Sequence, residues 1–507
     1  MTKGKRKAKD LAKRYEVIMK YLLGVDFGGG ASKATLLGVD GKVYATATYE
    51  YPTHYPAPGC AEQDPEDWYK ATVANVRAVM EKSGAAPTDI LALSLDAATH
   101  TAVLCDKDGK AVRPAIYWTD TRTVNEVKEL RAKHGSLIFE QALHNVDTIW
   151  TLPQILWVKN NEPELFAKTE RIMFAKDYVR QKITGDRVTD RIEAQGSMLY
   201  NCLTNEWSKE LCEMAGVRFD QLPELADPTD IVGKVSATAA ADLGIAEGCP
   251  VLAGMTDTVA EVFAAGAVNK KNVTLKLATA GRICVITDKA HPSVHLVNYS
   301  HITNGLWYPG TATKACASSL RWFRDTLGCM SYRELDEGAE KISVGCDGLM
   351  YHPYLNGELT PYADPALCGS FIGIRAGHTK AHFTRAVLEG VALSLMDCKK
   401  ALDGLNIPMD DYATAIGGGA ASPLWRQIVS DALGIKLQIR NVSDSSFGSA
   451  MLAGIATGVF ASPEDALAKC SEIKSETLPN PENTEKYEKM FEKYKAVHDA
   501  LAPIYHA

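Results

Sequence analysis

Two aspartates stand where apolar runs of the sequence end. Asp26 closes the run that begins at Tyr21, and Asp257 closes the run that begins at Val251. A carboxylate beside a hydroxyl can accept its proton and align it for in-line attack, and a carboxylate can also hold Mg²⁺ through waters. Each has a structural alternative, because Asp26 precedes a glycine turn and Asp257 precedes a helical segment.

Three turns are rich in small residues, and the first two offer backbone N–H groups to an anion. The first contains Gly28, Gly29 and Gly30 and is followed by Lys33, the second runs from Ala278 to Gly281, and the third runs from Gly417 to Ala420. A strand follows each of the first two turns, whereas Rossmann and P-loop sites have a helix directly after their glycines. This order favours phosphate-binding hairpin loops of the actin-like ATPase type. Ordinary hairpin turns are the structural alternative.

The elements that must position these residues occur in a repeated order. Residues 21–26, 33–39 and 43–48 are predicted strands, with Asp40-Gly41 as a tight hairpin between the last two. A helix is expected over 65–83 and further helices from about 123 to 185. Residues 273–277 and 282–286 repeat the layout of strand, small-residue turn and strand, so we expect an internal duplication.

Composition excludes several classes of function. The chain has 507 residues, 46% of them hydrophobic and 23% charged, which is typical of a globular protein of two large domains. A net charge of −7 gives no basic face for nucleic acid, so no nucleic-acid partner is expected. No run of about 18 apolar residues is present, and no membrane partner is expected.

The cysteines and the N-terminus suggest a cytoplasmic protein. Twelve cysteines are scattered without a CxxC pair, which favours reduced thiols over zinc ligands. Residues 1–19 form a basic extension that lacks the apolar core of a signal peptide, and Met19 precedes the first strand, so a misassigned start codon explains the extension better than targeting does.

Several longer motifs, taken together, resemble the FGGY family of carbohydrate kinases, and most closely its xylulokinase-like members. These motifs are Ala61-Glu62-Gln63-Asp64-Pro65-Glu66-Asp67-Trp68, Lys176-Asp177-Tyr178, Gly357-Glu358-Leu359-Thr360-Pro361, Arg385 to Val391, and Gly417 to Gln427. The resemblance implies an α/β protein of two ribonuclease-H-like (actin-like ATPase) domains with a cleft between them. It predicts an N-terminal domain over 20–252 and a C-terminal domain over 253–507.

The resemblance also implies ATP, Mg²⁺ and a small sugar or polyol as the ligands. Asp257 would be the general base, and Asp26 would organise Mg²⁺, with Asp257 also near the metal. The expected phosphate-binding residues are Gly28, Gly29, Gly30, Lys33, Thr279 and Gly281, and the expected adenosine-binding residues are Arg321, Gly418, Gly419 and Ala420. The expected sugar-binding residues are Thr99, His100, Trp150 and Asp257.

Three of these residues are also compatible with purely structural roles. Taken alone, His100 after a strand is more often structural than ligand-binding, Trp150 is compatible with a buried core residue, and Arg321 with a solvated surface cation.

The sequence departs from the family pattern at both phosphate loops. The first loop usually has hydroxyl residues where this chain has Gly29 and Gly30, and the second usually reads Gly-Thr-Ser where this chain has Ala278-Thr279-Ala280. The usual Gln-Met-His-Gly sugar turn is reduced to its histidine, His100. Backbone donors can replace hydroxyls, so activity is still expected.

These observations predict ATP-dependent phosphorylation of a ketose or polyol, with a pentulose such as xylulose as the leading acceptor. L-xylulose, ribulose, a tetrulose or a polyol remain open because the turn around His100 is altered. The alternative is a sugar- or nucleotide-binding sensor of the same fold that has lost turnover, and retention of Asp26 and Asp257 argues against it. The oligomeric state stays open, with a homodimer as one option.

Overall fold

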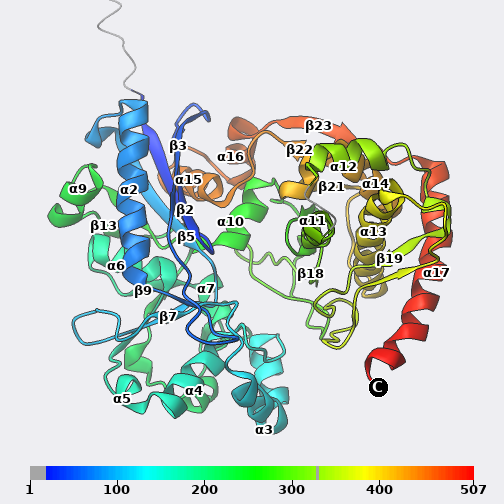
Figure 1. Cartoon of the computed structure of the whole chain (residues 1–507). Helices are drawn as coiled ribbons and strands as arrows, with labels where there is room; N and C mark the ends of the chain where they lie inside the picture. Colours follow the sequence, from blue (N-terminus) through cyan, green and yellow to red (C-terminus); the bar gives the residue numbers. More distant parts are fainter. Residues whose placement is uncertain (1–18, 327–329) are drawn as a thin grey trace, which may run out of the picture.

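The computed structural model describes residues 19–326 and 330–507. Residues 1–18 of the predicted basic extension therefore lie outside the described residues. Two large mixed sheets form its framework, each flanked by helices (Figure 1).

The first sheet opens with an antiparallel meander, as the sequence predicts. Its strands are β1 (Tyr21–Phe27), β2 (Ala31–Gly38), β3 (Val43–Glu50), β5 (Ile90–Ala97), β13 (Ile231–Lys234), β14 (Pro250–Leu252) and β15 (Met255–Thr256). They lie in the order β13-β14-β5-β1-β2-β3, with β15 also paired to β5. β5 is parallel to β1, and β14 and β15 are parallel to β5, so the sheet continues past residue 252.

The second sheet repeats this arrangement. Its strands are β16 (Val273–Leu277), β17 (Gly281–Val285), β18 (Gly310–Thr313), β21 (Tyr412–Ile416), β22 (Lys436–Arg440) and β23 (Ile473–Thr477). The order is β18-β17-β16-β21-β22-β23, with an antiparallel meander β16-β17-β18 and with β21 and β22 parallel to β16. The internal duplication predicted from the sequence is confirmed.

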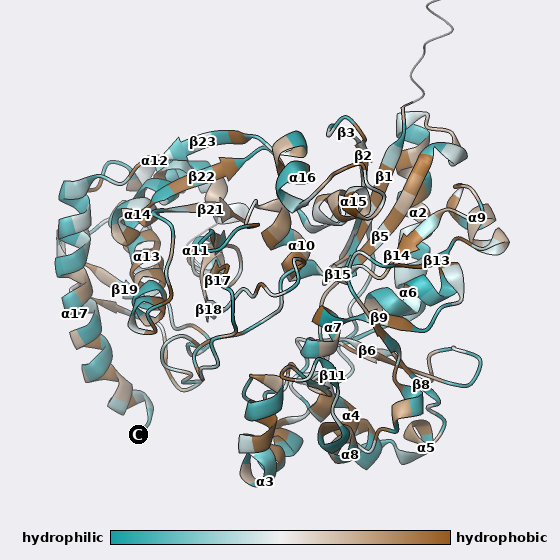
Figure 2. Ribbon diagram, turned by 180° about the vertical axis from the view of Figure 1, so that it is seen from behind, coloured by the Kyte–Doolittle hydropathy of each residue, from teal (hydrophilic) through white to brown (hydrophobic). Residues whose placement is uncertain are grey.

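Helices cover the sheets. In the first half they include α2 (Pro65–Ser83), α3 (Val124–Ala142), α4 (Thr151–Asn161), α6 (Ala175–Thr184), α7 (Arg191–Gly196) and α10 (Asp257–Ala264). In the second half they are α11 (Ala317–Thr326), α12 (Tyr332–Ala339), α13 (Lys380–Gly404), α14 (Pro423–Leu433), α15 (Ser445–Ala456), α16 (Pro463–Cys470) and α17 (Pro481–Tyr505). Hydrophilic segments are prominent on the peripheral helix α17, which buries a stripe containing Tyr487, Phe491 and Tyr494 (Figure 2).

Helix α2 shows how local signals set these bounds. Asp64 caps its N-terminus by accepting a hydrogen bond from the N–H of Glu66, Pro65 fills the first helical position, and Gly84 ends the helix in a left-handed conformation with φ 68°. Its buried face includes Trp68 and Val76, which pack in the cluster that covers β1 to β3. The predicted helix over 65–83 is confirmed.

Helix α15 connects the two halves of the molecule. It follows β22 of the second sheet, yet it packs on β1, β2 and β5 of the first sheet and on α10, and it lies with α10 between the two sheets (Figure 1). The packing is close enough to require glycine, because a Cβ on Gly24 would lie 2.0 Å from the carbonyl oxygen of Ser446 and a Cβ on Gly448 would lie 2.2 Å from that of Ala260.

We expect Gly448→Ala to lower the free energy of unfolding by roughly 1 to 3 kcal/mol, since the added methyl would push α15 away from α10. Gly135→Ala in α3 is the matched control: it meets nothing within 4 Å and should be neutral or stabilising, because alanine favours a helix. Chemical denaturation of the two variants measures the difference. Equal effects would mean that the close approach of α15 to α10 does not constrain stability.

Candidate active site

Asp26 and Asp96 form a pair of acids at the carboxyl ends of β1 and β5. The two residues are partners in the parallel register, and their side chains are hydrogen-bonded to each other, so one of them must carry a proton. The Ser449 hydroxyl of α15 donates a hydrogen bond to Asp96 Oδ2 at 2.5 Å. Burial raises the pKa of Asp26 to about 7 and raises that of Asp96 well above its ordinary value.

Asp257 is the first residue of α10, and Thr256 rather than Asp257 holds the cap position. The carboxylate accepts hydrogen bonds from the N–H and the hydroxyl of Thr258, at 2.6 and 3.2 Å. Burial raises the pKa of Asp257, while the positive charge of Lys276 on β16 opposes this shift. The charge of Asp257 in turn raises the pKa of Asp26, so Asp257 lies between the ends of β1 and β16.

The loop after β1 leaves two backbone N–H groups without an acceptor in the described residues. Its carbonyl groups are tied back by side chains: the Tyr51 hydroxyl donates to the Gly28 carbonyl at 2.6 Å, and Thr53 and Gln63 donate to the Gly29 carbonyl at 2.8 and 2.9 Å. Within the described chain, the N–H groups of Gly29 and Gly30 donate no hydrogen bond. Two adjacent free N–H groups beside Asp26 suit an anion such as a phosphate.

The loop after β16 has the same construction. The N–H of Ala317 in α11 donates to the Ala278 carbonyl at 2.7 Å, and the N–H of Cys316 and the hydroxyl of Ser318 donate to the Thr279 carbonyl at 2.9 and 2.8 Å. The N–H groups of residues 278–280 have no acceptor among residues 19–326 and 330–507. Thr279 is exposed, so its hydroxyl is accessible.

Three of the predicted phosphate ligands are occupied by other partners. Lys33 forms an ion pair with Asp444, the cap of α15, at 3.0 Å. The N–H of Gly28 donates to the Ala31 carbonyl at 3.0 Å, and the N–H of Gly281 donates to the Thr313 hydroxyl at 3.2 Å. The free donors in this structure are therefore in the middle of each loop.

His100 lies in a left-handed conformation, with φ 70°, just after β5. Its Nδ1 lies 2.8 Å from the Gly196 carbonyl, which must accept, so Nδ1 carries the proton and Nε2 accepts from the Tyr299 hydroxyl at 2.8 Å. Burial lowers the pKa of His100 to about 4, so the ring is neutral. Both ring nitrogens of His100 therefore have hydrogen-bond partners within the protein, and the buried Tyr299 hydroxyl is the partner of Nε2.

An aromatic wall and a buried acid support His100. Trp150 is 2% exposed, meets the His100 ring edge-on at 4.4 Å and stacks on His144 at 4.5 Å, so it is both a core residue and a neighbour of His100. The Thr99 hydroxyl and the His100 N–H donate to Glu193 at 3.3 and 3.1 Å. Glu193 thereby fixes the turn that carries both residues.

A fully buried ionic network lies behind this turn and accounts for the Lys176-Asp177-Tyr178 motif. Lys176 pairs with Asp177 at 2.5 Å and with Asp190 at 2.8 Å, and Arg180 pairs with Asp177 at 2.8 Å. Asp190 caps α7, the helix that carries Glu193. The motif thus supports the candidate site without facing it.

The third turn and α11 form the predicted adenosine side. A Cβ on Gly418 would meet nothing within 4 Å, whereas a Cβ on Gly419 would lie 2.8 Å from the ring of Trp425. Ala420 is buried and Arg321 is exposed on α11. Gly418 is therefore the position of this turn with open space beside it.

No group of three or more His, Cys, Asp or Glu side chains in the described ranges is arranged to hold a metal ion. Mg²⁺ commonly takes only one or two carboxylates, together with waters and substrate phosphates. Asp26 fits this pattern, because its buried Oδ1 has no hydrogen-bond donor in the described part of the chain.

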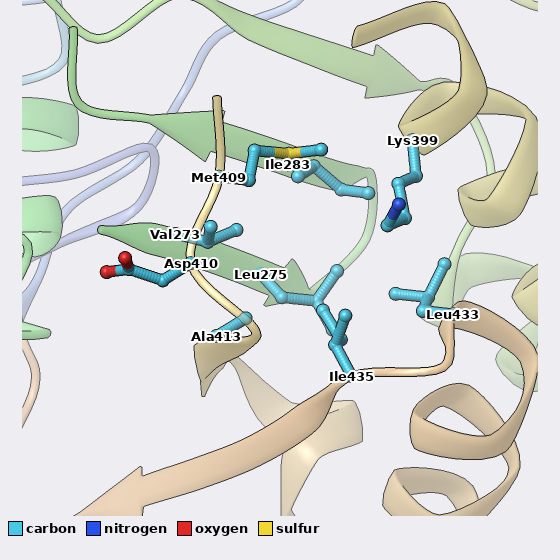
Figure 3. Close-up of a pocket in the computed structure, with 9 residues that line it drawn as sticks. All are labelled: Val273, Leu275, Ile283, Lys399, Met409, Asp410, Ala413, Leu433 and Ile435. Carbon is cyan, nitrogen blue, oxygen red and sulfur yellow. The ribbon is translucent and has the colours of Figure 1, made fainter. Parts of the chain in front are cut away.

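A small apolar cavity lies elsewhere, beside the second sheet (Figure 3). It is lined by Val273, Leu275, Ile283, Lys399, Met409, Asp410, Ala413, Leu433 and Ile435. Val273 and Leu275 alternate along β16 with Lys276, which lies near Asp257, so the cavity is on the opposite face of the sheet. It offers no set of polar groups for phosphate chemistry.

The sequence analysis missed several residues of this region. Asp96 ends an apolar run just as Asp26 does, and that signal could have identified it. Glu193, His144 and Tyr299 follow no motif and join the region only through folding. Arg282 directly follows the second loop, and the apolar run after it indicates only the start of a strand.

We expect Asp96→Asn to stabilise the protein, and to do so more at pH 8 than at pH 5. Raised pKa values mean that the native state binds more protons than the unfolded state, so stability falls as pH rises above the ordinary aspartate value of 3.8. Asparagine removes one of the acids, can donate to Asp26 and can accept from Ser449. Denaturation at both pH values should show a gain of about 1 to 2 kcal/mol at pH 8. A change that is independent of pH, as for Asp108→Asn at an exposed turn, would contradict the shared proton.

Comparisons with known proteins identify the family of this chain. The N-terminal domain of the FGGY family of carbohydrate kinases matches residues 21–264, and the C-terminal domain of that family matches residues 279–457. A xylulose kinase from Bacillus subtilis is 33% identical over 486 residues, which cover 95% of this chain and 97% of that protein. A gluconokinase from the same organism is 28% identical over 456 residues, covering 86% of this chain and 88% of that protein.

A solved xylulose kinase from Rhodospirillum rubrum superposes with a TM-score of 0.90 at 28% identity, and the match covers 96% of this chain and 100% of that protein. The two-domain actin-like fold predicted from the sequence is confirmed, and the family resemblance with it. The chain belongs to the FGGY family of carbohydrate kinases.

Proposed function

We propose that this carbohydrate kinase transfers the γ-phosphoryl group of ATP to a hydroxyl of a small ketose or polyol, with a pentulose such as xylulose as the leading acceptor. The observation that carries the proposal is that Asp257 lies near Asp26 and Lys276, on the strands that lead into two loops whose central N–H groups have no acceptor in the described residues. The full-length similarity to xylulose kinases supports the acceptor.

Asp257 is proposed as the general base. Its carboxylate would accept the proton of the acceptor hydroxyl as that oxygen attacks the γ-phosphorus in line. The free N–H groups of Gly29, Gly30 and residues 278–280 would hold phosphate oxygens in place of the missing hydroxyl side chains. Mg²⁺, when bound, would neutralise phosphate charge, and Asp26 is the residue proposed to orient it through water.

The other predicted residues keep supporting roles in this proposal. Gly418, Gly419, Ala420 and Arg321 would border the adenosine, and Thr99, His100 and Trp150 would form the acceptor side. We retain residues 20–252 and 253–507 as the two proposed domains. No helix in the described ranges is long and apolar enough to cross a membrane.

The rival proposal, a sensor without turnover, is motivated by the missing loop hydroxyls. Asp26, Asp257 and both sets of free N–H groups favour turnover instead. Release of ADP should be measured with a panel of ketoses, polyols and sugar acids, including xylulose and gluconate. Turnover with xylulose supports the proposal, turnover only with another acceptor corrects the substrate, and ligand binding without ADP release supports the sensor.

We expect Asp257→Asn to lower kcat by roughly 10² to 10⁴ and to leave ATP affinity nearly unchanged, because the amide cannot accept the proton. Stopped assays with saturating acceptor and calorimetry with ATP give the two numbers. Asp108→Asn, at an exposed turn, controls for handling of the variant. Near-normal turnover by Asp257→Asn would remove Asp257 from the role of base.

We expect His100→Ala and Tyr299→Phe to raise the KM for the acceptor by at least about tenfold, with the KM for ATP within about twofold. Both changes break the hydrogen bond that joins His100 to Tyr299, and that bond positions the Tyr299 oxygen. If ATP affinity falls instead, these residues belong to the nucleotide side. If only His100→Ala has an effect, the histidine contacts the acceptor without the tyrosine.

A further inference from the structure

Arg282 is the first side chain after the second phosphate loop. It follows Gly281 on β17 and is opposite Lys276 of β16 in the antiparallel register. Side chains alternate along a strand, and the next residue, Ile283, packs in the core cluster of the second sheet with Val273 and Leu275. Arg282 therefore points to the other face of the sheet, toward α10.

The residue two positions on confirms this direction. Cys284 lies on the same face as Arg282 and packs in the cluster that contains Tyr299, Tyr308 and Trp150. This cluster also contains Val259 of α10, whose first residue is Asp257. Arg282 thus lies between the second predicted phosphate loop and the aromatic cluster that contains Tyr299, the hydrogen-bond partner of His100.

The guanidinium of Arg282 lacks the partners that a buried cation normally has. Its Nε and Nη2 are buried without a hydrogen-bond acceptor in the described residues, it forms no ion pair there, and its side-chain hydrogen bond is to the weakly accepting thiol of Cys284. Lys276, its cross-strand neighbour, is by contrast paired with Glu261. An unpaired buried charge is costly, so a natural protein keeps one chiefly where a ligand completes it.

Two further unpartnered groups lie in the same cluster. The Tyr308 hydroxyl and Nε2 of His144 are buried and have no hydrogen-bond partner in the described chain. The His144 ring is 5.7 Å from Tyr299, which stacks on Tyr308 at 5.6 Å. Burial and then the Arg282 charge lower the pKa of His100. Burial chiefly raises the pKa of Tyr299 and Tyr308, the Arg282 charge opposes this and the Asp257 charge adds to it, so Arg282 and Asp257 both lie near these aromatic groups.

We propose that Arg282 is a catalytic residue that binds the transferring phosphoryl group. Nε and Nη2 form one edge of the guanidinium, and this edge matches two oxygens of an oxyanion. The residue would supply the charge stabilisation that Ala278 and Ala280 cannot supply as hydroxyl donors.

This role rests on the proposed phosphoryl transfer. The acceptor oxygen forms a bond to the γ-phosphorus, the bond from the γ-phosphorus to the bridging oxygen of ADP breaks, and Asp257 takes the acceptor proton. Arg282 keeps its own protons and stabilises the equatorial oxygens throughout. A carboxylate of an acidic acceptor is the other oxyanion that could meet this edge, but the position of Arg282 directly after the phosphate loop favours the phosphoryl group.

Arg282→Gln and Arg282→Lys test the proposal in the full-length enzyme. With a neutral acceptor, xylulose, the glutamine variant should lose roughly 10²-fold or more in kcat while both KM values stay within about threefold, and lysine should restore part of the loss. The thermal unfolding temperature should change little for both variants, since the native side-chain contact that is lost is the weak hydrogen bond with the Cys284 thiol. Arg333→Gln on an exposed helix is the matched control.

A second measurement does not depend on turnover. Calorimetry with ADP plus aluminium fluoride, a mimic of the transferring phosphoryl group, should show at least tenfold weaker binding to Arg282→Gln, with binding of ADP alone changed less than twofold. Equal losses for both ligands, or none, overturn the proposal.

The acidic acceptor is tested with gluconate. A rise in KM confined to gluconate, with normal kcat on xylulose, overturns the phosphoryl role in favour of a carboxylate site. A wild-type enzyme without turnover on any acceptor would refute the proposed function, and the aluminium fluoride measurement would still decide the role of Arg282.

Discussion

The close packing of α15 against β1 and α10 is the constraint on which the rest of the structure depends. α15 belongs by sequence to the second half of the chain, and glycines at 24 and 448 let its backbone approach the first sheet and α10. The same helix supplies Ser449 to Asp96 and, through its cap Asp444, an ion pair to Lys33. α15 is therefore joined to the first sheet and to α10 by close backbone contact, at the point where the carboxylates gather.

The two predicted phosphate loops are built in the same way. In each, side chains or a helix N-terminus tie the carbonyl groups back and leave adjacent N–H groups without an acceptor. A loop built in this manner has backbone donors for an anion, so the absence of hydroxyl side chains at Gly29, Gly30, Ala278 and Ala280 leaves the proposed phosphate site with donors. The motif that contains Gln63 is explained by this construction, since its side chain holds the Gly29 carbonyl and accepts from Trp68.

The candidate site contains several buried polar groups whose removal from water costs free energy. A shared proton relieves the charge of Asp26 and Asp96, neutral His100 is fixed between Gly196 and Tyr299, and Arg282 has no counter-ion in the described residues. In the structural Arg385–Glu389–Tyr487 cluster, by contrast, the carboxylate accepts from both partners. Buried atoms without a hydrogen-bond partner also occur outside the site, for example at Asp177 Oδ2 and the Tyr354 hydroxyl, so such atoms do not mark the site by themselves.

The sequence by itself determined the elements and their order. Period-two apolar runs, glycine turns and a capped helix such as α2 are local signals, so the two meanders, the helix over 65–83 and the loops after β1 and β16 were predictable from them. Only the tertiary structure decided which polar groups meet. Tyr299 reaches His100 across 199 residues and Ser449 reaches Asp96 across 353, and no local pattern encodes contacts of that range. Lys33 illustrates the limit, because its place in the loop suggested phosphate, whereas the fold brings Asp444 beside it. Spacing along the chain fixes backbone conformation, but the partner of a side chain depends on how distant elements pack.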